Sequence, residues 1–417
     1  MSTQEFTELL AEIDTIPAVD VHSRLQADAP AASDLAAMAL NDVVLGELSS
    51  ANAPSEFFQT DGAKKMLQES IEYLPRINNT TTCWLLAQIL GDLYDSKPFD
   101  ECDLQALWQK VDSTATDAKW PESVLERSNL TKDLHCCDWH RPLPQASEKF
   151  APIIRIDSLI NEAHTSRTLD RLNEATDQPV YEIADLKKAI VELFRRAKSA
   201  GALAASVSLE PQVDFEVGNR DAGDRVLSLV LLGQKVNRDE RKALRSFVID
   251  TVLDECKEYR MPIQLLVGKR YLRSGEREIA AYEPGMVAMY ADLVGRHSGV
   301  KFDFLCAHDA LARELAVLSR GFRNVFLSGS WMYLAFPSRM RQAIRERVEM
   351  LPMTKCCGLA SDAESVEWVY AQAKLVRRET AFALAQLVDE GYLTRGTAID
   401  FARNYLLDNP KRIYKIE

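Results

Sequence analysis

The chain has 417 residues, 47% of them hydrophobic and 27% charged, a composition that can bury one large core or two smaller ones. Its formal net charge of −12 argues against nucleic acid or an anionic membrane as a partner, since both are bound by clustered Lys and Arg. No apolar run approaches the roughly 20 residues of a membrane span, and Met1–Phe6 lacks the pattern of a secretory signal. We therefore expect a cytoplasmic protein.

Eight short apolar runs, separated mostly by segments with helical periodicity, indicate the strands of the fold. The expected strands are Val19–Leu25, Thr131–Cys137, Ala151–Asp157, Ala202–Glu210, Pro262–Gly268, Phe302–His308, Asn324–Ser330 and Cys356–Asp362. Eight parallel strands that alternate with helices close into a barrel whose active site lies at the carboxyl ends of the strands. The pattern thus predicts an α/β protein with a distorted (β/α)8 TIM barrel.

About a hundred residues without a convincing strand separate the first two expected strands. Helical spacing occurs there at 33–45, Gly62–Ile77, Thr82–Leu93 and Asp103–Val111. Insertions of this kind in the loops of a barrel commonly cover its active site. We therefore divide the chain into residues 1–25 (a helix and the first strand), 26–130 (a helical insertion over the barrel mouth) and 131–417 (the rest of the barrel and the C-terminal helices).

The end of the chain has the pattern of two helices. Arg377–Leu393 and Thr397–Leu407 have helical spacing, and Asn409-Pro410 is expected to stop the second helix. Eight cysteines without a Cys-x-x-Cys pattern indicate neither a disulfide framework nor a zinc ribbon.

The first expected strand carries Asp20-Val-His22-Ser-Arg24, in which three polar side chains alternate and so share one face. Two histidines in the second and third of these places would bind a divalent cation at the end of the strand. The third place is held by Arg24, which cannot lose its proton to become a ligand and whose charge repels a cation.

Two kinds of site remain open from the residues alone. In a metal site, His22, Asp362 and Glu210 would supply a nitrogen and two carboxylate oxygens, although Asp362 could equally pair with Arg24. In an anion site, the cations at the ends of expected strands would converge in one mouth and bind a carboxylate; they are Arg24, Arg155, Lys269 and Arg270. Trp331 could form a flat wall against a sugar ring or serve as a core aromatic.

These segments, taken in order, resemble the uronate (glucuronate) isomerases of the amidohydrolase superfamily, especially their shorter, divergent branch. Ile16–Leu25 is similar to the family's first metal strand, which reads Asp-x-His-x-His, and Phe150–Glu162 is similar to its Leu-Arg-x-Asp stretch. Further similarities join Val124–Asp138 to the second strand, Phe322–Val325 and Gly329–Trp331 to the Asn-Val and Gly-x-Trp-Trp segments, and Ser361–Ala363 to the Ser/Thr-Asp-x-Arg segment.

The resemblance implies an aldose–ketose isomerisation of uronic acids such as glucuronate, with zinc held by first-strand histidines and a last-strand aspartate. Carried over to this chain, His22 is the first metal histidine and Asp362 is a metal ligand or the catalytic base. Arg155 is a catalytic and substrate-binding residue, and Trp331 is a wall of the pocket. On electrostatic grounds, rather than from the resemblance, we expect Arg24 to be a second contact for the carboxylate of the acid.

The departures from the family pattern fall at the site itself. Arg24 replaces the second metal histidine, and Glu364 replaces the arginine that follows the last aspartate. Met332 stands for the second tryptophan, and Ala360 for a histidine of the divergent branch. We therefore expect a degenerate zinc site that binds the metal weakly or not at all, with Arg24 paired to Asp362 or Glu364.

Three functions are compatible with this pattern. The protein could be a uronate isomerase acting on glucuronate or galacturonate, a barrel enzyme with altered chemistry on a related sugar acid, or a non-catalytic sugar-acid-binding homologue. Tightly bound zinc would indicate that Glu210 or His140 has become a ligand. In each case the expected partner is a small sugar acid, and a homo-oligomer is compatible with all three.

Overall fold

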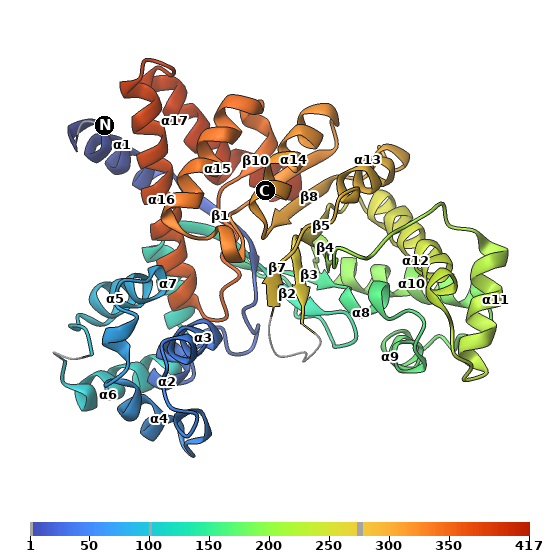
Figure 1. Ribbon diagram of the computed structural model, residues 1–417, viewed down its shortest axis with the longest axis horizontal. Helices are drawn as coiled ribbons and strands as arrows, with labels where there is room; N and C mark the ends of the chain where they lie inside the picture. Colours follow the sequence, from blue (N-terminus) through green and yellow to red (C-terminus); the bar gives the residue numbers. More distant parts are fainter. Residues whose placement is uncertain (1–2, 100–101, 273–277) are drawn as a thin grey trace.

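The computed structural model of the protein describes residues 3–99, 102–272 and 278–417. Parallel strands form one sheet in the order β1-β2-β3-β4-β5-β8-β9-β10 (Figure 1). Their bounds are β1 (Ala18–Ser23), β2 (Leu130–Asp138), β3 (Phe150–Arg155), β4 (Ala204–Ser208), β5 (Ile263–Val267), β8 (Phe302–Cys306), β9 (Val325–Ser328) and β10 (Cys356–Cys357). Each expected strand is present in its expected order, which confirms the (β/α)8 barrel.

The barrel is closed by the segment that follows β10 rather than by β10 itself. Three backbone hydrogen bonds join this segment to β1, from Val21 N to Leu359 O (3.1 Å), from Asp362 N to His22 O (2.9 Å) and from Arg24 N to Ala363 O (2.8 Å). Asp362 has a positive φ of 52°, which a regular strand does not allow. The expected strand Cys356–Asp362 is therefore too long, and Arg24 lies one residue beyond β1.

Helices follow the strands around the outside of the barrel. Their bounds are α1 (Thr3–Thr15), α8 (Asp157–Asn161), α9 (Ser166–Thr176), α10 (Ile183–Ser199), α11 (Arg220–Leu231), α12 (Arg238–Glu258), α13 (Met286–Arg296), α14 (Asp309–Gly321), α15 (Pro337–Met350), α16 (Val366–Asp389), α17 (Arg395–Arg403) and α18 (Asn409–Tyr414). Among the described residues, no helix is long and apolar enough to cross a membrane.

Two features of this outer layer differ from the expectations. An antiparallel hairpin, β6 (Lys269–Tyr271) with β7 (Glu278–Ala280), follows β5. The helical structure does not stop at Asn409-Pro410, as the sequence pattern predicted. A π-helical turn over Asn404–Asp408 leads into α18, and Pro410 lies in the first turn of that helix. Proline is tolerated there because its missing N–H would have no helical partner.

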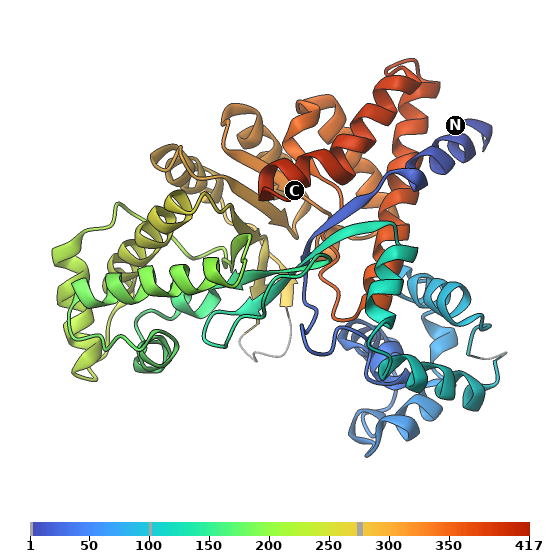
Figure 2. The same ribbon diagram turned by 180° about the vertical axis from the view of Figure 1, so that it is seen from behind.

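The chain between β1 and β2 is helical, with α2 (Leu35–Ala39), α3 (Asp42–Ser50), α4 (Ala63–Ser70), α5 (Thr81–Tyr94), α6 (Leu104–Ala115) and α7 (Trp120–Arg127). These helices form a lobe beside the barrel, drawn in blue to teal (Figures 1 and 2). Glu367 of α16 is fully buried and anchors the lobe. It accepts hydrogen bonds from Trp120 Nε1 (2.8 Å), Ala32 N (3.1 Å) and Tyr94 OH (3.3 Å).

Two carboxyl groups face each other inside the barrel as register partners on β1 and β2. Asp20 and Asp133 are fully buried, and one oxygen of each has no hydrogen-bond partner. Burial raises the pKa of Asp20 to about 6, and burial together with the charge of Asp20 raises the pKa of Asp133 well above its usual value. The folded protein therefore binds a proton here that the unfolded chain releases at lower pH.

Asp133→Asn is expected to stabilise the protein at pH 8. The pair destabilises the fold as pH rises from the unfolded pKa near 3.9 toward about 6, because the folded state holds its protons longer than the unfolded chain does. An amide removes one buried charge and can donate to Asp20. We expect a melting temperature higher by about 2 °C or more at pH 8, with the gain shrinking toward pH 4.

The matched control is Asp254→Asn, at an exposed position of α12. This variant also loses one carboxyl group but should show no such pH-dependent gain. A melting temperature of Asp133→Asn that stays at or below the wild-type value at pH 8 would contradict the shared-proton account.

Candidate active site

Two cavities open at the carboxyl ends of the strands. The first, of about 480 Å³, lies between the helical lobe and the ends of β1, β9 and β10; we call it the lobe cavity, and Arg24, Asn41, Thr82, Trp331 and Asp362 are among its lining residues. The second, of about 940 Å³, lies at the ends of β2, β3 and β4 against α8, α9 and α12. We call it the arginine cavity, and it is lined by Arg155, Glu210, Tyr271 and several further arginines.

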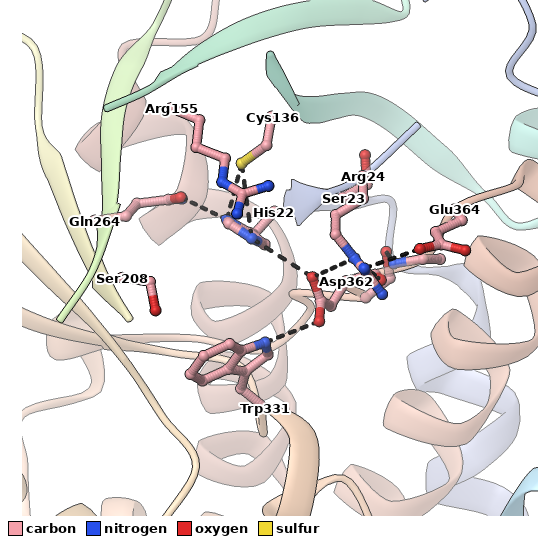
Figure 3. A network of polar contacts seen from close by, with 12 residues as sticks. His22, Ser23, Arg24, Cys136, Arg155, Ser208, Gln264, Trp331, Asp362 and Glu364 are labelled. Carbon is pink, nitrogen blue, oxygen red and sulfur yellow. Dashed lines mark hydrogen bonds and ion pairs between the residues drawn. The ribbon is translucent and has the colours of Figure 1, made fainter. Parts of the chain in front are cut away.

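The closing seam of the barrel brings His22, Arg24 and Asp362 together (Figure 3). Arg24 Nε lies 3.0 Å from Asp362 Oδ1, and Arg24 Nη1 lies 2.9 Å from Glu364 Oε1. His22 Nε2 is 3.7 Å from the same Asp362 Oδ1. The expected pairing of Arg24 with Asp362 or Glu364 is thus confirmed, and it includes both carboxylates.

Trp331 forms the other side of this cluster. Its Nε1 donates to Asp362 Oδ2 at 3.0 Å, and Lys269 Nζ lies 5.1 Å from the centre of its ring. The Trp331 side chain is buried, yet the residue lines the lobe cavity. Asp362 Oδ2 therefore has a fixed hydrogen-bond donor, while Oδ1 is ion-paired with Arg24, whose Nε also donates to the backbone oxygen of Asp362 at 3.1 Å. The Asp362 side chain remains 24% exposed.

The tautomer of His22 follows from its neighbours. Gln264 Nε2 donates to Val21 O (2.6 Å) and to Tyr414 OH (2.7 Å), and a backbone carbonyl can only accept. Gln264 Oε1 must then be the atom that faces His22 Nδ1 at 2.7 Å, so Nδ1 carries the proton. Burial lowers the pKa of His22, which keeps the ring neutral and leaves a lone pair on Nε2, beside Asp362.

Cys136 and Arg155 border the other side of the imidazole. Cys136 Sγ lies 3.5 Å from His22 Nδ1 and 3.7 Å from Nε2, and burial raises the pKa of the thiol well above its usual value. Arg155 is held by Asp157, with Nε 2.8 Å from Oδ2, and Figure 3 shows its guanidinium beside His22 and Cys136. The thiol is thus a neutral wall of the site, and Arg155 is its second cation.

The third place of the family's first-strand motif is held by Arg24, whose guanidinium cannot serve as a metal ligand. A catalytic zinc needs three protein ligands. His22 and Asp362 are two donors, but Arg24 Nε occupies the Asp362 oxygen that lies nearest to His22. In the part of the chain that the structure describes, no three His, Cys, Asp or Glu side chains gather where they could hold a metal.

Several expected site residues lie elsewhere. Glu210 and His140 line the arginine cavity and do not join His22 and Asp362, so the three-ligand set with Glu210 is not formed. Lys269 and Arg270 lie on the hairpin that the sequence pattern did not indicate. Lys269 pairs with Glu278 (2.9 Å) while its Nζ also lies near the ring of Trp331, and Arg270 pairs with Glu283 (2.5 Å). Of the four expected cations, Lys269 and Arg270 therefore already have carboxylate partners on or beside the hairpin.

Three residues of the site were missed by the sequence analysis. Gln264 is a lone amide in the apolar run Ile263–Val267, a position that demands a buried hydrogen-bond partner and could have been noticed. Cys136 belongs to no Cys-x-x-Cys pattern, and nothing in the sequence places its thiol against His22. Tyr414 gave no signal, because nothing in the pattern of the chain's end places its hydroxyl inside the barrel beside Gln264.

The fold defines a class, namely a (β/α)8 barrel with a helical lobe after the first strand. More narrowly, the chain has the fold of the uronate isomerases. The uronate isomerase of Thermotoga maritima superposes with a TM-score of 0.89 and 15% identity, covering 99% of this chain and 98% of that one. The glucuronate isomerase of Caulobacter crescentus gives 0.88 and 15%, covering 99% and 94%.

Sequence comparison adds a weaker signal. A uronate isomerase of Cutibacterium acnes (strain DSM 16379 / KPA171202) is 24% identical over 103 residues, which span 25% of this chain and 22% of that protein. No protein-family model matches the chain. The resemblance seen in the motifs is therefore confirmed at the level of the fold.

Gln264→Leu is expected to weaken the preference of His22 for the tautomer with the proton on Nδ1, because it removes the acceptor of that proton. The measurement is nitrogen NMR of protein labelled at histidine, with the His22 signal identified by its loss in His22→Gln. In the wild-type protein this signal should show that Nδ1 carries the proton. In Gln264→Leu that preference should weaken. A wild-type His22 protonated on Nε2 would contradict the assignment.

Arg24→His is expected to raise zinc affinity by about tenfold or more, since it supplies a third ligand and removes a fixed charge. Arg24→Gln is the matched control, because it removes the charge without adding a ligand. Zinc retained after dialysis should be measured in all three proteins. If Arg24→His remains as metal-poor as the wild type, this substitution does not explain the altered site.

Proposed function

We propose that the protein catalyses the aldose–ketose isomerisation of a uronic acid of the glucuronate or galacturonate class. The observation that carries this proposal is the pair of half-exposed guanidiniums, Arg24 and Arg155, beside the His22–Asp362 contact in a barrel with the uronate isomerase fold. A cationic mouth in a chain of net charge −12 favours a small acid as its ligand.

The two arginines are suited to a carboxylate. Arg24 and Arg155 are 42% and 43% exposed, and each uses Nε for a carboxylate of the protein. These bonds fix the direction of each guanidinium while outer N–H groups remain for a ligand. Each arginine lines a different cavity, so a bound acid would lie where the lobe cavity and the arginine cavity approach each other.

The isomerisation moves protons and needs no oxidant or reductant. In the open-chain sugar, a base removes the proton from carbon 2, and a proton is delivered to carbon 1 as the hydroxyl proton passes from O2 to O1. Asp362 is the proposed base, because its carboxylate is exposed to the mouth whereas His22 is buried. The lone pair of His22 Nε2 lies beside Asp362 and can accept its proton.

Arg24 and Arg155 would also stabilise the negative charge that develops on the sugar oxygens, the task a metal ion performs in the family pattern. We propose that zinc contributes little to binding or turnover, since the ligands present fall short of a zinc set.

A second candidate function is supported by the same substitution. A chain that has exchanged a metal histidine for Arg24 could bind a sugar acid without converting it, or act on a related acid by altered chemistry. Such a homologue would be stabilised by uronates or aldonates but would neither form the ketose nor exchange the hydrogen on carbon 2.

The first test is thermal stabilisation by glucuronate, galacturonate and aldonates, with and without added zinc. We expect a uronate to raise the melting temperature, zinc to add little, and Arg155→Ala to lose about tenfold or more in affinity through the missing charge-assisted contact. Arg313→Ala, at an exposed position of α14, is the control for loss of an arginine. A wild-type response retained in Arg155→Ala would contradict the role given to Arg155.

The second test is turnover, followed by proton NMR in D₂O. Ketose formation and loss of the carbon 2 hydrogen are expected for the wild type, and Asp362→Asn should lower the rate by at least about a hundredfold as its base is lost. Uronate binding without turnover would favour the non-catalytic alternative. Stoichiometric dependence on zinc would contradict the proposed role of the arginines.

A further inference from the structure

The arginine cavity contains a cluster of cations that the proposed reaction does not use. Arg238, Arg241 and Arg245 recur on α12 at spacings of three and four residues, which places them on one face of the helix. Arg171 of α9 and His164 also line the cavity. This is an unusual concentration of positive charge in a chain whose net charge is −12.

The arginines of this cluster form no ion pairs with carboxylates of the protein among the described residues. Among the described residues, no ion pair joins Arg171, Arg238, Arg241 or Arg245 to a carboxylate, and Arg245 Nε is buried without a hydrogen-bond acceptor. The one acid opposed to Arg245, Asp214, is itself paired with Lys242 at 3.1 Å. Like charges held together repel one another, so this wall is stabilised when an anion binds.

Electrostatics at the neighbouring groups agrees with this view. Burial lowers the pKa of Arg245, with Arg241 and Arg238 acting in the same direction and Asp214 against it. Burial also lowers the pKa of His164, and Arg241 and Arg245 add to that effect. Both groups thus sense a local excess of positive charge.

The opposite side of the cavity has a different chemistry. Glu210, Asp138 and Asp157 come from the ends of β4, β2 and β3, where Arg155 also lines the cavity. Asp157 is held by Arg155, while Glu210 accepts a hydrogen bond from Gln212. Carboxylate oxygens can accept hydrogen bonds from sugar hydroxyls. Between the two sides lies a volume of about 940 Å³, ample for more than one sugar ring.

We propose that the arginine cavity is a second anion subsite that holds the next residue of a uronate oligosaccharide. The reducing-end uronate lies at Arg24 and Arg155, its neighbour occupies the cavity, and the neighbour's carboxylate binds Arg241 and Arg245. The inference rests on the proposed function and narrows its substrate class from a single sugar acid to a chain of at least two.

The test compares ligands on the full-length protein by calorimetry at constant ionic strength. The probes are galacturonate, digalacturonate, a disaccharide with the same reducing-end uronate and a neutral second residue, and inorganic phosphate. We expect digalacturonate to bind about tenfold or more tightly than galacturonate, since it adds a charge-assisted contact, and the neutral disaccharide to gain less.

Arg241→Gln and Arg245→Gln should each reduce the advantage of digalacturonate while leaving galacturonate binding unchanged. Arg313→Gln, an exposed change of equal charge on α14, should reduce neither. Arg241 is exposed, so its replacement leaves the core intact.

Equal affinity for galacturonate and digalacturonate would overturn the subsite, and so would an equal gain from the neutral disaccharide. Inorganic phosphate that binds more tightly than digalacturonate and is lost in Arg241→Gln would show a free-phosphate site instead. Each of these outcomes leaves galacturonate binding intact, whereas failure of the proposed function would appear as loss of galacturonate binding itself.

Discussion

The backbone hydrogen bonds between β1 and the segment after β10 are the constraint on which the site depends. They close the barrel, and they also bring residues from the two ends of the chain within contact distance, since Asp362 N bonds to His22 O and Arg24 N to Ala363 O. The left-handed conformation of Asp362 turns its carboxylate toward Arg24 and Trp331. The contacts that close the barrel therefore also hold the cluster together in the folded protein.

Arg24 sets the charge of this cluster. A histidine at this place would offer a nitrogen lone pair, whereas the guanidinium offers only N–H donors and pairs with both Asp362 and Glu364. The exchange of Arg24 and Glu364 relative to the family pattern is compensatory, because each new charge has the other as a partner.

The strands could be predicted because each is a bounded apolar run in a parallel sheet. The contacts of Arg24 could be predicted because a positive charge at position 24 and a negative charge at position 364 both depart from the family pattern and can pair with each other. The hairpin that carries Lys269 and Arg270 could not be predicted, since it depends on pairing between β6 and β7, including the Lys269–Glu278 ion pair, and not on any apolar pattern. The arginines of α12 recur at helical spacing in the sequence, but an ordinary solvent-exposed helix face has the same spacing. The packing of α8, α9 and α12 around one cavity is what distinguishes a cavity wall from such an exposed face.

The site is also connected to the last helix of the chain. Tyr414 donates to Asp303 Oδ2 and accepts from Gln264, which in turn fixes the His22 proton. Ser328 donates to the same Asp303 oxygen at 2.6 Å, so the network ties β5, β8 and β9 to α18. Because Asp303, Gln264 and His22 are all buried, none of these groups can exchange its partner for water. The orientation of His22 is thus set by the packed base of the barrel, while exposed arginines at the mouth remain able to meet a ligand.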